Sequence, residues 1–293
     1  MEESLLYVTH MLNGILMLAI PIGLGIYLTR RFQSSWRLWW IGAATFVLSQ
    51  VGHIPFNLGL NQLFKNNFIP TPPLSWILPF NALVLGFSAG LWEEFFRYFT
   101  YRFWAKEARS WQTAILLGAG HGGMEAILLG VLVIIAYFQM LALQGVDPSS
   151  IAPPEQVEQL QAIISQYWSI PWYSSLLGAI ERIFTLPAHL TLSVLVWQVF
   201  RRAQIRWVWL AVCWHAMMNA VISIVAQKWG PLQAEGILGI FALINIAIII
   251  RLHTPEPETS NILTQPLSKI SIADSKLKEI EETSDQLDQT RYN

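Results

Sequence analysis

Apolar residues in this chain gather in long runs that are separated by short polar segments. Each run is long enough to cross a bilayer as a helix, and backbone groups in lipid must find their hydrogen bonds within the segment. The pattern predicts an all-α, polytopic membrane helical bundle of about seven spans. We place these spans at residues 6–28, 38–58, 77–102, 111–141, 172–199, 207–227 and 235–252.

Two segments depart from this pattern. In the loop 143–171, apolar residues recur at helical spacing after Pro153 and Pro154, which predicts a short helix on the outer membrane surface. From residue 254 onward the chain is polar and nearly free of aromatic residues, as is typical of solvated, unstructured segments. We therefore divide the chain into a transmembrane helical domain at 1–253 and a disordered cytoplasmic tail at 254–293.

Basic residues are unevenly shared between the two sets of loops. The loops after the second, fourth and sixth spans hold only two basic residues, Lys65 and Lys228. The loops after the first, third and fifth spans hold Arg30, Arg31, Arg37, Arg97, Arg102, Lys106, Arg109, Arg201, Arg202 and Arg206. Because basic residues accumulate on the cytoplasmic side, we expect the N-terminus outside and the C-terminus in the cytoplasm of a plasma-membrane protein.

Two local features limit the fold class further. The chain opens Met1-Glu2-Glu3, without the basic segment of a signal peptide, so we expect the first span to be retained as a membrane anchor. Cys213 is the single cysteine and cannot form an intramolecular disulfide, which excludes a cysteine-framework fold.

Charged residues interrupt the third predicted span. Glu93, Glu94 and Arg97 lie three or four positions apart, so one side of a helix can carry all three. Charges inside a membrane are energetically expensive, and they commonly mark functional sites. Arg97 could neutralise one carboxylate and leave the other as a general base. The structural alternative is an ion pair that positions a helix end.

Three later spans carry histidines beside other polar residues. The small residues around His121 permit close helix packing. Taken alone, each group could be an interhelical hydrogen bond, and we expect Glu181 and Arg182 to make structural ion pairs that involve Glu125. The groups are His121 with Glu125 in the fourth span, Glu181, Arg182 and His189 in the fifth, and His215 with Asn219 in the sixth.

The four polar groups share a common depth. At about 1.5 Å per residue, the three histidines and the glutamate pair lie roughly 12–18 Å from the inner ends of their spans. Histidines that serve packing independently have no reason to choose one depth. We therefore expect these groups to meet in one layer of the cytoplasmic half, within a catalytic core at about 77–227.

These motifs resemble those of the intramembrane endopeptidases grouped as CAAX prenyl proteases and bacteriocin-processing enzymes, and within that superfamily the YhfC-like and PrsW-like membrane proteins. Those families carry a Glu-Glu pair before a basic residue, helices with single histidines, and a late His-x-x-x-Asn/Asp. Here the stretches Glu93-Glu94-Phe95-Phe96-Arg97 and His215-Ala216-Met217-Met218-Asn219 match. The Glu-Glu-x-x-Arg spacing is one residue shorter than in the prenyl proteases, which favours the YhfC-like branch.

The resemblance implies an enzyme that hydrolyses a peptide bond near the cytoplasmic side of the membrane with a glutamate-activated water. Glu93 or Glu94 would be the base, a histidine would position the water, and His215 with Asn219 would stabilise the oxyanion. This glutamic mechanism needs no cofactor, and it is the favoured expectation because the prenyl proteases are held to act without metal.

Zinc is the alternative within the protease interpretation. His121, His189 and His215 could supply three imidazoles and leave a fourth position for water, as in open catalytic zinc sites. Against it, the chain has no His-Glu-x-x-His helix.

Two other function classes fit parts of the pattern. Chains of acidic residues and histidine also build proton-coupled transporters, but here they are biased toward one half and no inverted repeat is visible. A membrane scaffold that has lost catalysis would keep the same residues. The expected partners are the lipid bilayer and a membrane protein or peptide substrate, with no nucleic acid; the sequence leaves the oligomeric state open.

Overall fold

The computed structural model describes residues 2–255, and every regular element in that part of the chain is a helix. This confirms the all-α class. The elements are α1 (Glu2–Arg31), α2 (Arg37–Lys65), α3 (Leu74–Phe99), η1 (Thr100–Trp104), α4 (Trp111–Ala142), η2 (Pro148–Ser150), α5 (Pro154–Ser169), η3 (Ser174–Leu176), α6 (Leu177–Arg202), α7 (Arg206–Trp229) and α8 (Pro231–Arg251).

Helices occupy every position at which the sequence predicts a span. Within the described residues, six of these helices are long and apolar enough to cross a membrane, namely α1, α3 with η1, α4, α6 with η3, α7 and α8. α2 is not among them, since it carries a series of polar residues along its length, including Gln50, His53 and Asn57. The count of seven spans therefore stays a prediction.

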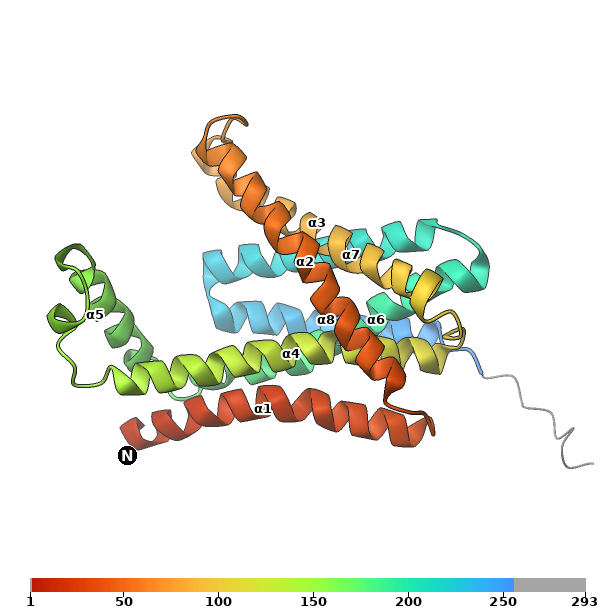
Figure 1. The fold of residues 1–293 in the computed structure, drawn as a ribbon, viewed down its shortest axis with the longest axis horizontal. Coiled ribbons are helices and arrows are strands. Elements are labelled where there is room, and N and C mark those ends of the chain that lie inside the picture. Colours follow the sequence, from red (N-terminus) through yellow and green to blue (C-terminus); the bar gives the residue numbers. More distant parts are fainter. Residues whose placement is uncertain (1, 256–293) are drawn as a thin grey trace, which may run out of the picture. The chain divides into compact units, whose positions relative to one another are not determined.

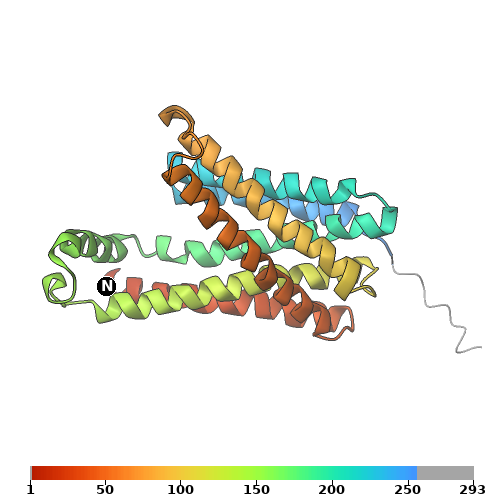
Figure 2. The ribbon, with the colours of Figure 1, turned by 45° about the horizontal axis from the view of Figure 1, so that its top comes forward.

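The helical unit spans Met1–Thr254. In it, α1 runs beside α4, α3 beside α7, and α6 beside α8, while α2 crosses α4 obliquely (Figures 1 and 2). The turns that follow α1, η1 and α6 lie at one end of the unit, away from the α2–α3 turn and α5 (Figure 1). These are the basic turns of the sequence, so their charges gather at one end. That this end faces the cytoplasm stays a prediction.

Glycines allow the backbones of α2 and α4 to touch where they cross. A Cβ on Gly42 would lie 2.0 Å from the carbonyl oxygen of Leu117, and one on Gly120 would lie 1.8 Å from that of Trp39. No side chain fits in so short a distance. The predicted role of the small residues around His121 in close packing is thus confirmed. Because His121 directly follows Gly120, this crossing also fixes the position of His121 along α2.

α5 confirms the short helix predicted in the loop 143–171. Its last turn packs on α1, with ring centroids 4.5 Å apart for Tyr167 and His10 and 4.8 Å apart for Trp168 and Tyr7. Its location on a membrane surface stays a prediction. The tail predicted at 254–293 lies, except for its first two residues, outside the described residues.

Candidate active site

The two adjacent carboxylates of α3 turn to different partners. Glu94 is fully buried and accepts two hydrogen bonds from Nη1 of Arg97, at 3.0 and 2.9 Å. Nδ1 of His215, on α7, lies 2.9 Å from the same carboxylate. Glu93 instead places Oε2 at 3.1 Å from Nε2 of His121, on α4, and lines a cavity. Arg97 therefore neutralises Glu94 and leaves Glu93 as the carboxylate that faces the cavity.

His189 on α6 joins this group from the other side. Its Nδ1 lies 3.3 Å from Nη2 of Arg97 and its Nε2 lies 3.0 Å from Oε2 of Glu125. Because a guanidinium can only donate, Nδ1 accepts and Nε2 carries the proton that Glu125 accepts. Gly122 makes room for the ring, since a Cβ there would lie 2.7 Å from the imidazole.

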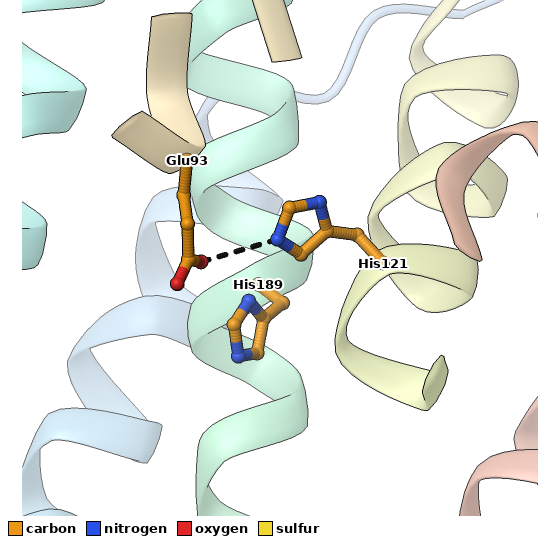
Figure 3. Close-up of side chains that lie close together, drawn as sticks. All are labelled: Glu93, His121 and His189. Carbon is orange, nitrogen blue, oxygen red and sulfur yellow. Dashed lines mark hydrogen bonds and ion pairs between the residues drawn. The ribbon is translucent and has the colours of Figure 1, made fainter. Parts of the chain in front are cut away.

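Glu93, His121 and His189 converge on one point from three helices (Figure 3). One possible ligand atom from each lies within 4.8 Å of the others, and all three side chains are buried. A second group of this kind, Glu93 with Glu94 and His215, shares the Glu93 carboxylate. Among the described residues, these two groups have metal-ligand character, and the three predicted histidines do not form one group by themselves.

The predicted structural ion pairs are present beside this centre. Nη1 of Arg182 lies 2.8 Å from Oε1 of Glu125, and Nη2 of Arg182 pairs with Glu181. Glu125 contacts both Arg182 and His189, so these pairs extend the site instead of standing apart from it.

The cavity beside Glu93 has a volume of about 440 Å³. His189, His215 and Asn219 line it together with Glu93, and α2 and α8 complete its wall through residues such as His53 and Leu238. The predicted site residues thus fall into two sets. Some line the cavity, whereas Glu94, Arg97 and His121 are buried beneath its wall and do not line it.

Sequence reasoning missed a polar series on α2. Gln50, His53 and Asn57 hydrogen-bond one another in turn, Gln50 reaches Glu93, and Ser88 of α3 bonds to Asn57. Their spacing of three and four residues is the same signal that marked the polar stripe of the fifth span. The spacing is therefore visible in the sequence itself, inside a span that is otherwise apolar.

A family model described as "YhfC intramembrane metalloprotease" matches residues 16–266. The chain belongs to the YhfC family. A relative in Bacillus subtilis (strain 168), "Uncharacterized membrane protein YhfC", is 28% identical over 249 residues, which are 83% of this chain and 93% of the relative. No solved structure matches the chain.

Membership fixes the broad function. This YhfC protein is an integral, multi-pass membrane protein and a peptide hydrolase by family, acting in a lipid bilayer on a protein or peptide. The expectation of a cofactor-free mechanism is not supported, because the family is described as a metalloprotease and the structure groups candidate metal ligands. The zinc alternative is supported instead.

Proposed function

We propose that this YhfC protein hydrolyses peptide bonds of membrane-embedded substrates at a zinc site formed by Glu93, His121 and His189. The observation that carries the proposal is the convergence of one carboxylate and two imidazoles at the edge of a cavity. Two histidines and a glutamate are a known ligand set of catalytic zinc, with a fourth position kept for water or substrate.

The residues present fit such an ion. The cluster holds the buried carboxylates of Glu93 and Glu94 and the partly buried one of Glu125 against two guanidinium groups, those of Arg97 and Arg182. This leaves at least one negative charge in surplus, because the more exposed Glu181 shares Arg182 as well. A divalent cation would offset that surplus, which is otherwise costly in a membrane. His189 also holds a carboxylate on its Nε2, as metal-binding histidines usually do on the nitrogen that faces away from the metal.

Glu93, His121 and His189 are a better site than the other combinations. An ion in the second group would have to displace two contacts of Glu94, those with Arg97 and His215. In the favoured group it would displace one, the contact of Arg97 with Nδ1 of His189. The three-histidine set predicted from the sequence would likewise need His215 to leave Glu94.

The roles of the remaining residues follow from their positions. Zinc bound here would polarise a substrate carbonyl and activate water. His215 and Asn219 line the cavity beside Glu93, where we assign them to hydrogen-bond the oxyanion. Glu125 holds His189 through Nε2. Nδ1, which accepts from Arg97 in the structure, would be the nitrogen that binds the ion. Enclosure of the site strengthens each of these electrostatic contacts.

Metal analysis combined with a cleavage assay tests this function. Purified protein should carry about one zinc per chain and cleave candidate membrane peptides, and strong chelators should abolish cleavage. Glu93→Gln, His121→Ala and His189→Ala should each lose bound zinc and at least about a hundredfold in activity. His253→Ala, at an exposed histidine outside the site, is the matched control and should keep both.

Two results would contradict the proposal in different ways. Full zinc content in both His121→Ala and His189→Ala would show that these histidines are not zinc ligands. Chelator-resistant activity without bound zinc would replace the metal mechanism with the glutamic one, and Glu93, the carboxylate at the cavity, would then be the base. Full activity in Glu93→Gln would exclude both the zinc mechanism and the glutamic mechanism at this site.

Two broader proposals accompany this function. On the Glu93-Glu94 and His215/Asn219 motifs, we propose kinship with the CAAX prenyl protease and PrsW-like superfamily, beyond the YhfC family itself. On the distribution of basic residues, we propose that the active layer lies in the cytoplasmic half of the membrane.

A further inference from the structure

A series of polar side chains on α2 and α3 ends at Glu93. Nε2 of Gln50 donates to Oε1 of Glu93 at 3.3 Å, and Oε1 of Gln50 lies 3.1 Å from Nδ1 of His53. Nδ2 of Asn57 lies 2.9 Å from Nε2 of His53, and Oγ of Ser88 donates to Oδ1 of Asn57 at 2.9 Å. Among the described residues, the two candidate metal groups include none of these four side chains.

The direction of every hydrogen bond in this series follows from its end at Glu93. A carboxylate only accepts, so the amide nitrogen of Gln50 faces Glu93 and its amide oxygen faces His53. Nδ1 of His53 must then carry the proton, which leaves Nε2 to accept from Asn57. Each group therefore donates toward Glu93, and each orients the next.

We infer that Gln50, oriented by His53, is a positioning residue that holds the Glu93 carboxylate toward the zinc site. Gln50 occupies Oε1 of Glu93, whereas Oε2 faces Nε2 of His121 at 3.1 Å. The amide thus determines which carboxylate oxygen is presented to the ligand centre. The inference rests on the proposed function, and it gives α2 a part in metal binding. Outer partners of this kind typically change metal affinity by about 10–100-fold.

The competing role for these residues is purely structural. Asn57 and Ser88 link α2 to α3, and hydrogen bonds between packed helices contribute modestly to stability. If the role is only structural, variants that lose this link should unfold at a lower temperature and keep the zinc affinity of the parent. Zinc affinity is therefore the deciding quantity, measured on the intact protein by competition with a chelator of known affinity.

Four variants separate the two roles. Gln50→Met keeps the length of the side chain and should weaken zinc binding by about 10–100-fold. His53→Leu frees the Gln50 amide and should also weaken binding, whereas His53→Asn keeps an N–H donor near the position of Nδ1 and should restore affinity to within about threefold of the parent. Gln62→Met makes the same change on the exposed end of α2 and should have no effect.

The outcomes are distinct for the inference and for the function. Parent-like zinc affinity in Gln50→Met, or no difference between His53→Leu and His53→Asn, overturns the positioning role while the zinc site stands. If the parent protein binds no zinc, the proposed function fails and the positioning role falls with it. Should Gln50→Met not fold, the comparison of His53→Leu with His53→Asn decides alone.

Discussion

Arg97 is a buried cation whose charge is balanced by one neighbour. The side chain is fully buried on α3 and directs its Nη1 to both oxygens of Glu94. Its Nη2 reaches Nδ1 of His189, the nitrogen that an ion at the proposed site would take over, so the same guanidinium contacts both Glu94 and a proposed zinc ligand. Neutralising Glu94 would leave Arg97 uncompensated in a nonpolar environment.

We therefore expect the two glutamates to respond differently to the same substitution. Glu94→Gln should destabilise the protein by about 3–5 kcal/mol, because it leaves a buried charge without its partner. With zinc removed from both proteins, Glu93→Gln removes the surplus charge and should unfold near the temperature of the zinc-free parent. Thermal unfolding in detergent measures both.

The double variant Glu94→Gln/Arg97→Met is the control for this prediction, since it removes the cation as well and should recover much of the loss. Equal unfolding temperatures for the two single variants would show that Arg97 is not held by Glu94.

At this scale the sequence predicted which residues lie together better than how they pair. Charge, spacing and depth predict that Glu93, His121, His189 and His215 meet, and the structure brings them together. Both glutamates lie within reach of Arg97 at helical spacing, so their division between Arg97 and His121 depends on rotations about side-chain bonds that only packing sets. The same is true of His215, which turns to Glu94.

Among the elements, the crossing of α2 and α4 is the tightest contact near the site. Gly42 of α2 faces backbone, whereas Gly59 on the same helix has nothing within 4 Å of an added Cβ. The two positions therefore allow one substitution to be compared in two environments.

Gly42→Ala should destabilise the protein by about 1–3 kcal/mol, because the carbonyl oxygen 2.0 Å from the new Cβ belongs to backbone and cannot rotate away. It should also lower zinc affinity, since His121 follows this crossing by one turn of α4. Gly59→Ala should change stability by no more than about 1 kcal/mol, in the favourable direction. Unfolding temperature and zinc titration together test this, and a parent-like Gly42→Ala would refute the close contact.

Element positions were predictable because apolar runs of membrane length have few alternatives to helix. The boundary that differed most is the end of α2, which continues to Lys65 where the sequence predicted an end near residue 58. Asn61, Gln62 and Lys65 make this last part of the helix polar, so hydropathy ends the span too early. The residues that hydrogen-bond within the site, Gln50 and His53, lie inside the predicted span.

For the whole molecule, the sequence predicts the membrane topology, that is, which ends of the helices face the cytoplasm. Reporter fusions after residues 33, 107 and 204 should report the cytoplasm, and fusions after 66 and 150 the outside, because the basic turns gather at one end. The pair at 33 and 66 decides whether α2 crosses the membrane. If 107 and 150 report the same side, α4 does not cross, and the common depth of the site loses its basis.

The size of the cavity limits the form in which a substrate can react. One turn of an α-helix is about 5.4 Å long and 10–12 Å wide with its side chains, so it fills on the order of 400–600 Å³. The cavity of about 440 Å³ is comparable in volume with one such turn. We therefore expect a membrane-spanning substrate to unwind locally before its peptide bond reaches Glu93. Glycine or proline near the scissile bond would lower that unwinding free energy, so selectivity would follow the helix stability of the substrate as much as the shape of its side chains.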